Sequence, residues 1–548
     1  MLSGMTLTAR TSTESSDSIA AILASHPPLQ YEYTQLKNRV TELSRQLAWF
    51  QNQLFGSKSE KRYADGESRQ MSLGEGLDTL PVAPPVETIA VHYERRRGKQ
   101  PLENAVSEAG LRFGPKVPVQ EIRLDPPELK SLTTDDYTII GEDVTHRLAQ
   151  RPGSYVVLKY VRPVVKLKNA AHEEVNIITA SAPGNVLDKC SADVSLLAGM
   201  LVDKFVYHLP LYRIHQRLKD AGIELARGTL TTWVQRSIEL LAPIHQAQWD
   251  SILTSRTLAM DETPIKAARK EPGKMGTGYF WPVYGDRDEV VFPFFNNRGS
   301  KNIETVLKHY QGVLLTDGYA AYAKYAQQVN TVVHAQCWAH TRRLFLKAED
   351  SEPERTKTAL EYIRRLYHHD AHLKERELSD DECRDARGRA MQGAIAEKRL
   401  LYRTEHSKPV VEAFFVWLEQ QLTERCLLPQ DPFTQAASYA LQRKDALSVF
   451  LAYPDVPLDT NHLERALRVI PMGRKNWLFC WSETGAECVG IIQSLLTTCK
   501  LQGVSPYDYL VDVLQRVGQH PASKVHELTP RLWKTLFAHA PLRSPLAQ

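Results

Sequence analysis

The chain has 548 residues, of which 43% are hydrophobic and 24% charged, and its formal net charge is +4 at pH 7. This length predicts several structural units, and so small a net charge means that any affinity for nucleic acid must come from local basic clusters. The seven cysteines form no CxxC pair and no run of about 18 apolar residues occurs, so the sequence favours a reduced cytoplasmic protein over a secreted or membrane-spanning one.

The first 115 residues are predicted to lie outside the globular part. Residues 1–28 are rich in Ser and Thr, which predicts a disordered tail. Residues 29–62 repeat apolar side chains at steps of four and three, which predicts a dimerising coiled coil, although a helix packed on its own domain would show the same pattern. Residues 63–115 are predicted to be a linker whose basic arm contacts phosphates. The coiled-coil seam comprises Leu29, Tyr33, Leu36, Val40, Leu43, Leu47, Phe50 and Leu54, and the arm comprises Arg95, Arg96 and Arg97.

Two further units precede the candidate chemical site. In residues 116–185 the segment SYVVLKYVRPVVKLK is rich in β-branched residues, which predicts a β-rich module made of a hairpin or a small sheet. Residues 186–252 show helical periodicity, with one amphipathic helix ending at Gly222 and another beginning near Thr229. This pair predicts a helix-turn-helix that contacts DNA through Arg227 and Arg236, while a plain helical hairpin explains the pattern nearly as well.

Short β runs follow from about residue 255. They are TLAMDETPIK, GYFWPVYG, EVVFPFFNN and VLLTDGY, and a helix capped by Ser300 precedes the last of them. Strand, hairpin, strand, helix and strand in this order predict an α/β sheet with mixed pairing. Asp261 ends the first strand and Asp317 the last, so both residues lie at one edge of the sheet if these strands are neighbours.

A third acidic residue, Glu464, lies on a predicted helix in DTNHLERALR. Three gathered carboxylates need a cation, and hard divalent ions such as Mg²⁺ bind oxygen ligands and bridge them to phosphates. The pattern therefore points to phosphodiester chemistry. Each residue also has an ordinary alternative, because Asp261 and Asp317 occur in turn-like contexts and Glu464 has the spacing of a capping box with Asn461.

Basic residues accompany Glu464. Asn461, Glu464, Arg465 and Arg468 share one helical face, so guanidinium groups and the carboxylate would approach the same phosphates, unless Arg468 simply pairs with Glu464. The basic residues predicted to contact DNA here are Arg465, Arg468, Arg474 and Lys475.

His340 lies in the segment CWAHTRRLF. It is a candidate for orienting the attacking group or the scissile phosphate, and a histidine satisfied within the core is equally compatible with the pattern. Cys337 and His340 have half the spacing of a zinc site, but no second pair accompanies them, so zinc is not expected there.

Five motifs, in this order, resemble the transposases of the insertion-sequence-66 family, a branch of the DDE transposases with a ribonuclease-H-like catalytic fold. They are MDETP, TDGYAAY, CWAHTRRLF, NHLERALR and GRKNWLF, and the likeness extends from LAWFQNQLFGSKSEKR through LPLYR to the end of the chain. The resemblance implies that Asp261, Asp317 and Glu464 are catalytic metal ligands, with His340 as a further catalytic residue. It also implies that Mg²⁺, or Mn²⁺ in its place, is the cofactor.

The same resemblance implies an activity and partners. The activity is cleavage and strand transfer of double-stranded DNA at the terminal inverted repeats of an insertion sequence, in the cytoplasm of a bacterium and at its nucleoid. The expected partners are element ends, target DNA, further copies of the chain in a homodimer or higher oligomer, and accessory proteins of the same element. A catalytically inactive DNA-binding regulator is the alternative, and a hydrolase of other substrates with paired carboxylates would act without metal.

The expected fold class is multidomain α+β. Asp317 and Glu464 are 464 − 317 = 147 positions apart, too many for a bare ribonuclease-H-like core. We therefore expect a core at 253–348 and 455–482, a helical insertion at 349–454 and a helical C-terminal region at 483–548. Members of the family commonly carry cysteine pairs of a zinc module before the helical region, but the first cysteine here is Cys190, so zinc is not expected and residues 116–185 would have to be held by packing.

Overall fold

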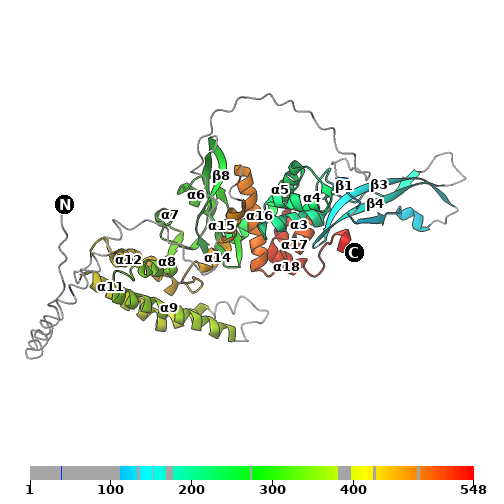
Figure 1. Cartoon of the computed structure of the whole chain (residues 1–548). Helices are drawn as coiled ribbons and strands as arrows, with labels where there is room; N and C mark the ends of the chain where they lie inside the picture. Colours follow the sequence, from blue (N-terminus) through cyan, green and yellow to red (C-terminus); the bar gives the residue numbers. More distant parts are fainter. Residues whose placement is uncertain are drawn as a thin grey trace, which may run out of the picture.

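The structure is a computed structural model that describes residue 39 and residues 112–547, except 116, 132–135, 152, 168–176, 272–273, 380–395, 424–427, 478–479 and 481. The predicted tail, coiled coil and basic arm, with Arg95, Arg96 and Arg97, lie outside the described residues apart from the single residue Arg39. The described part contains helices and several sheets, as the predicted α+β class requires. It is elongated, with a β hairpin at one end and a helical unit at the other (Figure 1).

A mixed five-stranded sheet lies between these ends. Its order is β11–β10–β7–β13–β14, in which β7, β13 and β14 run parallel while β10 pairs antiparallel with both β7 and β11. The predicted α/β sheet with mixed pairing is therefore present. The strands are β7 (Thr257–Met260), β10 (Val283–Gly285), β11 (Glu289–Val291), β13 (Gly312–Thr316) and β14 (Val332–Gln336).

The chain leaves this sheet after β7 to form two strands of a separate three-stranded sheet, returns for β10 and β11, and then adds the third strand to the second sheet. This sheet has the order β12–β9–β8 and consists of β8 (Thr263–Glu271), β9 (Lys274–Phe280) and β12 (Phe294–Phe295). The run TLAMDETPIK thus contains the whole of β7 and the beginning of β8, which belongs to a different sheet.

Helices cover both faces of the five-stranded sheet because alternate strand residues point to opposite faces. Leu258 and Leu314 pack into a cluster with residues of α6 (Lys301–Leu307) and α7 (Ala320–Gln328). Ser300 occupies the N-cap position of α6, as predicted, but its side chain makes no capping hydrogen bond.

The opposite face is shared by two groups of helices. Ala259 packs into the cluster that contains the helices near the C-terminus, whereas Leu315 packs into the cluster of the helical insertion. The described helices of the insertion are α9 (Pro353–Ser379), α11 (Lys408–Thr423), α12 (Pro432–Leu441) and α13 (Lys444–Ser448), and α8 (Trp338–Leu346) connects them to the sheet.

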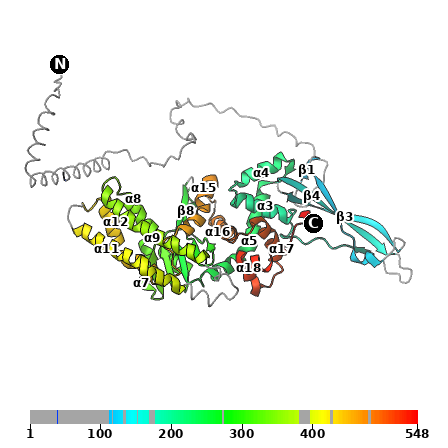
Figure 2. The same ribbon diagram turned by 90° about the horizontal axis from the view of Figure 1, so that it is seen from below.

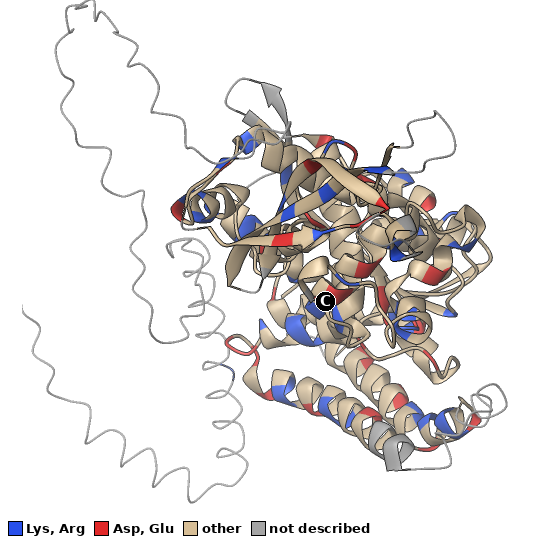
Figure 3. Ribbon diagram, turned by 90° about the vertical axis from the view of Figure 1, so that its right-hand side faces the viewer, with Lys and Arg blue, Asp and Glu red and all other residues tan. Residues whose placement is uncertain are grey.

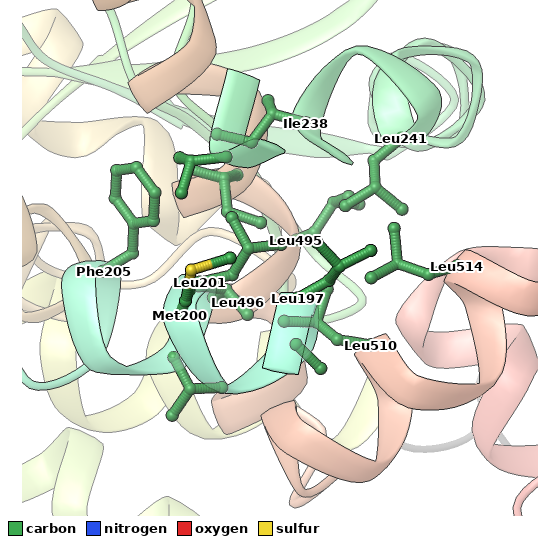
Figure 4. Packing of buried hydrophobic residues seen from close by; sticks show 14 of the residues in the cluster. Leu197, Met200, Leu201, Phe205, Ile238, Leu241, Leu495, Leu496, Leu510 and Leu514 are labelled. Atoms are coloured by element: carbon green, nitrogen blue, oxygen red, sulfur yellow. The ribbon is translucent and has the colours of Figure 1, made fainter. Parts of the chain in front are cut away.

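The helices on either side of the core in the sequence pack together in space. α3 (Val194–Phe205), α4 (Leu211–Asp220) and α5 (Arg227–Ile252) precede the sheet, and α16 (Glu483–Leu501), α17 (Pro506–Arg516) and α18 (Pro530–Leu536) follow it. Their apolar faces meet in one core, where Leu197 of α3 lies among Leu241, Leu495 and Leu510 (Figure 4). Burying a leucine side chain contributes about 1.5–3 kcal/mol, so this core is a major source of stability.

The β-rich module is present and is held by packing. Its sheet has the order β2–β4–β3, with β5 paired to β4, and its strands are β2 (Val119–Arg123), β3 (Tyr137–Arg151), β4 (Ser154–Leu167) and β5 (Ile177–Thr179). Gly153 turns the β3–β4 hairpin with a positive φ of 81°, which glycine adopts without strain. Tyr160 and Leu158 form a small cluster with Leu546 from the far end of the chain. The hairpin projects away from the helices in both ribbon views (Figure 2).

Charges of both signs are mixed over the described surface (Figure 3). Any affinity for nucleic acid would therefore have to come from particular basic residues, as the small net charge suggested. Among the helices that the structure describes, none is long and apolar enough to span a membrane.

Candidate catalytic site

The first two candidate carboxylates lie at the same edge of the five-stranded sheet. β7 and β13 are parallel neighbours, with Ala259 opposite Leu315, and Asp261 and Asp317 follow the last residues of these two strands. The carboxyl ends of parallel strands are where open α/β sheets bind ligands. The expectation that the two strands are neighbours is confirmed.

Glu464 comes to this edge on α14 (Asn461–Leu467). The segment before α14 is tied to the end of β14, because Trp338 N donates to Leu458 O (2.9 Å) and the backbone N of Thr460 donates to Cys337 Sγ (3.3 Å). Cys337 is thus a buried structural residue. Its position fixes the beginning of the helix that carries the third acid.

Both aspartates make a turn-type hydrogen bond with one oxygen. Asp261 Oδ1 accepts from Glu262 N (2.8 Å), and Asp317 Oδ1 accepts from Tyr319 N (2.9 Å) at the beginning of α7. The turn roles considered from the sequence are therefore real, but they use one oxygen of each carboxylate. No hydrogen bond between described residues engages Oδ2 of either side chain, so these two oxygens remain available to a ligand.

The acids interact electrostatically. Burial, together with the negative charges of Asp317, Glu262 and Glu464, raises the pKa of Asp261 to about 7, against the opposing effect of its hydrogen bond from Glu262 N. Several carboxylates in a partly dry site repel one another, and this repulsion favours a bound cation.

Glu464 has a different partner from the one expected. Thr460, and not Asn461, occupies the N-cap position of α14, and the carboxylate of Glu464 makes no capping contact, so the capping-box alternative is excluded. Arg343 Nη2 instead donates to Glu464 Oε1 (2.7 Å) and Oε2 (2.8 Å). The suggested pair between Arg468 and Glu464 is wrong, since Glu464 pairs with Arg343 and His340 lies beside it.

His340, which lies on α8, is next to Glu464 of α14. Its Nε2 is 3.2 Å from Arg343 Nη1 and 3.8 Å from Glu464 Oε1, while Nδ1 is buried without a hydrogen-bond partner in the described part of the chain. Burial, then the charge of Arg343, lowers the pKa of His340, so the ring is neutral at pH 7. A neutral imidazole beside the acids can accept a hydrogen bond from a reacting group.

Comparison with known families identifies the chain. The family model for the IS66 transposase family matches residues 189–488, and the model of the IS66 C-terminal element matches residues 494–531. The chain belongs to the IS66 transposase family. A third model, described as transposase C of IS166 homeodomain, matches residues 42–106, which include much of the predicted coiled coil.

Three relatives of this IS66-family chain come from Sinorhizobium fredii, and all three are named only as uncharacterized proteins. y4hP is 30% identical over 411 residues, which is 73% of this chain and 72% of the relative. y4jD is 29% identical over 538 residues, covering 93% and 98%, and y4qI is 27% identical over 532 residues, covering 93% and 92%. The second and third likenesses extend over nearly the whole length of both proteins.

The three acidic side chains are suitable ligands for a divalent cation, but in this structure they lie too far apart to bind one together. Carboxylate oxygens are the ligands that Mg²⁺ prefers, and Oδ2 of Asp261 and of Asp317 is available. In the described residues, however, no three His, Cys, Asp or Glu side chains lie close enough together to hold a metal ion. The contact with Arg343 explains this for Glu464, which would have to leave the guanidinium to join the aspartates.

The predicted DNA-contacting residues occupy two regions of the IS66-family chain. Arg465, Arg468 and Lys475 are exposed on α14 and on α15 (Val469–Trp477), the helix that follows it, whereas Arg474 Nη1 donates to Pro264 O (2.6 Å) and ties α15 to β8. Far along the chain, at α5, Arg227 lies over the ring of Tyr212 (4.8 Å), and Arg236 Nη1 donates to Asp188 O (3.0 Å). Arg474 and Arg236 therefore have structural contacts as well.

Sequence reasoning missed two groups of residues at this site. Arg343 lies on another helix and 121 positions from Glu464, and only its place in the motif CWAHTRRLF could have drawn attention to it. Glu262, adjacent to Asp261, has a side chain that is only 3% exposed; it pairs with Arg298 and accepts from Tyr322 Oη (2.7 Å). Glu262 therefore supports the turn that presents Asp261.

Proposed function

We propose that this protein is a DDE transposase that cleaves DNA at the terminal inverted repeats of its insertion sequence and joins the cut ends to target DNA, in a metal-dependent reaction. The observation that carries the proposal is the parallel pairing of β7 with β13, which presents Asp261 and Asp317 at one sheet edge, with Glu464 brought towards it on α14. Membership of the IS66 transposase family supports the same conclusion.

We further propose that the catalytic core is ribonuclease-H-like. In support, β7, the first strand of the sheet in the sequence, is its central strand. On one side of β7 lie β10 and β11, which pair antiparallel along β7–β10–β11, and on the other lie β13 and β14, which run parallel to β7. The helical insertion lies between β14 and α14 in the sequence, so it separates the second acid from the third without interrupting the sheet.

Each residue has a role in the proposed reaction. Asp261, Asp317 and Glu464 would hold Mg²⁺ or Mn²⁺, and the chemistry supplied by such bound ions is activation of water or a DNA 3′-hydroxyl and stabilisation of the leaving oxygen. His340, neutral and half-buried, would orient the attacking group. Arg465 and Arg468 would contact the phosphates on either side of the scissile bond, with energies typical of charge-assisted hydrogen bonds. Catalysis then needs no covalent protein intermediate.

The DNA would also contact elements outside the core. α4 and α5 are joined by the short segment 221–226, and Arg227, exposed at the beginning of α5, would contact a phosphate or a base edge. Lys475 on α15 would extend the basic surface that Arg465 and Arg468 form beside Glu464. The predicted coiled coil would bring a second copy of the chain, and with it a second element end. Proteins encoded beside this one would be further members of the complex.

The test is cleavage of a duplex that contains the element end. We expect Asp261→Ala, Asp317→Ala and Glu464→Ala each to reduce Mg²⁺-dependent strand cleavage by about 10³-fold or more, while the Kd for the same duplex changes by less than about threefold, because these residues act on the reacting phosphate. The matched control is Asp250→Asn, at an exposed aspartate of α5 that pairs with Lys308, and this variant should cleave normally.

The same assay separates the proposed enzyme from a DNA-binding regulator. Specific binding by the wild-type protein without any nicking in Mg²⁺ or Mn²⁺ would favour the regulator. Retained cleavage in one of the three alanine variants would remove that residue from the catalytic set.

A further inference from the structure

We propose that Arg343 and a divalent cation are alternative partners of Glu464, and that the guanidinium of Arg343, once displaced by the cation, binds a DNA phosphate. The inference rests on the proposed function, because it concerns the same acids. It assigns to Arg343 a positioning role that neither the sequence motifs nor the family membership supplies.

The first step is the contact itself. Arg343 Nη2 donates to both carboxylate oxygens of Glu464, at 2.7 and 2.8 Å. A guanidinium so placed supplies the positive charge that a metal ion would otherwise supply. Of the three candidate ligands, Glu464 is the one with such a partner, since no described basic side chain pairs with Asp261 or Asp317.

The second step is the position of Glu464. No three acidic, histidine or cysteine side chains among the described residues converge closely enough for a metal ion, although Glu464 is near enough to Asp261 to affect its charge. A carboxylate that belongs to the metal site is therefore held aside by the arginine. Moving it to the aspartates requires breaking this one ion pair.

The third step is the cost of that exchange. The side chains of Arg343 and Glu464 are 50% and 26% exposed, so water reaches the pair. Ion pairs in such settings contribute little to stability, and a divalent cation bound by three carboxylates outweighs them. The pair is strong enough to hold Glu464 when metal is absent and weak enough to yield when metal binds.

The fourth step is the destination of the freed guanidinium. Arg343 remains attached to α8, beside His340, and thus beside the site where the scissile phosphate would lie. A planar guanidinium matches the oxygens of a phosphate as well as those of a carboxylate. Metal binding would therefore produce a phosphate-binding group at the site where one is needed.

The first measurement is Mn²⁺ affinity without DNA, read by the electron paramagnetic resonance signal of free Mn²⁺. Loss of the competitor in Arg343→Gln should tighten binding roughly fivefold, the size expected for a partly exposed ion pair. Arg342→Gln removes the same charge from the neighbouring exposed residue, which has no carboxylate partner in the described chain, and should leave the affinity within about twofold. Unchanged or weaker Mn²⁺ binding by Arg343→Gln would overturn the proposal.

A double-mutant comparison locates the effect. With Glu464→Gln in the background, the gain from Arg343→Gln should disappear, because no carboxylate remains for the arginine to hold. An equal gain in both backgrounds would mean that Arg343 repels the cation from a distance, which contradicts the exchange. Arg343→Lys keeps the charge but cannot span both oxygens, and should give an intermediate affinity.

The second measurement is the affinity for an element-end duplex with and without Ca²⁺, used as a binding probe. Arg343→Gln should lose about fivefold in affinity with Ca²⁺ and less than about twofold without it, because only the metal-bound protein has a free guanidinium. An equal loss in both conditions would show a constant DNA contact and would refute the exchange. If the wild-type protein bound Mn²⁺ and DNA in this way but never cut DNA, the proposed function would fail and the exchange would stand.

Discussion

Two adjacent acidic residues in the segment MDETP, Asp261 and Glu262, differ in their hydrogen-bond and ion-pair partners. Asp261 is partly exposed, has an oxygen without a hydrogen bond, and has a raised pKa because of burial and neighbouring negative charges. The side chain of Glu262 is only 3% exposed, and although burial raises its pKa too, it pairs with Arg298 and accepts a hydrogen bond from the hydroxyl of Tyr322. Residues that bind a ligand commonly lower the stability of the folded protein, whereas residues that only hold them in position do not.

This contrast predicts opposite effects on stability. In metal-free buffer at pH 7, Asp261→Asn should raise the melting temperature, because it removes a repelled carboxylate, and Glu262→Gln should lower it. Loss of the charge on Glu262 weakens its ion pair with Arg298, whose side chain is 45% exposed, with an expected cost of about 1 kcal/mol. Differential scanning fluorimetry on both variants checks the signs, and a destabilised Asp261→Asn would contradict the account of the site.

At the scale of elements, α16 lies unusually close to the sheets. Thr498 and Ser494 side chains hydrogen-bond to the backbone N of Val290 and Phe292 (3.1 and 2.9 Å), and Gln248 of α5 donates to Val290 O (2.8 Å). Side chains of two helices thus satisfy the backbone of β11, which is an edge strand and would otherwise offer its groups to other chains.

Gly490 permits this approach. A Cβ at residue 490 would lie 2.4 Å from Phe292 O, a backbone atom that cannot rotate away. Gly490→Ala should therefore destabilise the protein by about 1–3 kcal/mol although alanine favours helices. Gly228 on α5 has open space around its missing Cβ, so Gly228→Ala is the matched control and should be neutral or stabilising by up to about 1 kcal/mol. Urea unfolding of both variants gives the comparison.

α5 also carries a pH-dependent element of stability. His245 is 9% exposed, its Nε2 has no hydrogen-bond partner among the described residues, and burial lowers its pKa to about 4. In the unfolded chain the ring takes up a proton near pH 6.5, whereas in the folded chain it does so only near pH 4, so stability falls as the pH drops between these values.

The expected size of this loss is about 3 kcal/mol at the acid end, since one pKa unit corresponds to about 1.4 kcal/mol. His245→Leu should therefore show a smaller fall in melting temperature than the wild-type protein between pH 6.5 and pH 4.5. Parallel slopes for the two proteins across this range would show that the histidine does not contribute.

The sequence predicts elements better than the contacts between them. The short β runs and the turn acids at their ends were recognisable because strands and turns have local signatures, and Asp261 and Asp317 then followed from strand pairing. The partner of Glu464 was not predictable, because Arg343 reaches it through the packing of α8 and α14 and no periodicity records that contact. The packing of α16 on β11 escaped prediction for the same reason, since helical amphipathicity gives the buried face but not its neighbour.

At the scale of the whole molecule, we expect assembly to depend on the predicted coiled coil of residues 29–62, of which the structure describes Arg39 alone. The predicted seam places Leu43 in the interface and Thr41 outside it. Leu43→Asp should shift the sedimentation coefficient of the full-length protein towards that of the monomer, whereas Thr41→Asp should not. Equal sedimentation of both variants and the wild type would mean that the helix packs on its own domain.

The length of α5 sets the distance between two parts of the molecule. It is a single helix of 26 residues, about 39 Å long, whose first turns belong to the α4–α5 pair and whose last turns lie against the five-stranded sheet. Although Pro243 lies inside α5, the helix separates its two ends, so a duplex bound near its beginning would lie at a distance from the sheet that α5 sets. Inserting base pairs between the recognised sequence and the cut should then displace the cut rather than stretch the protein.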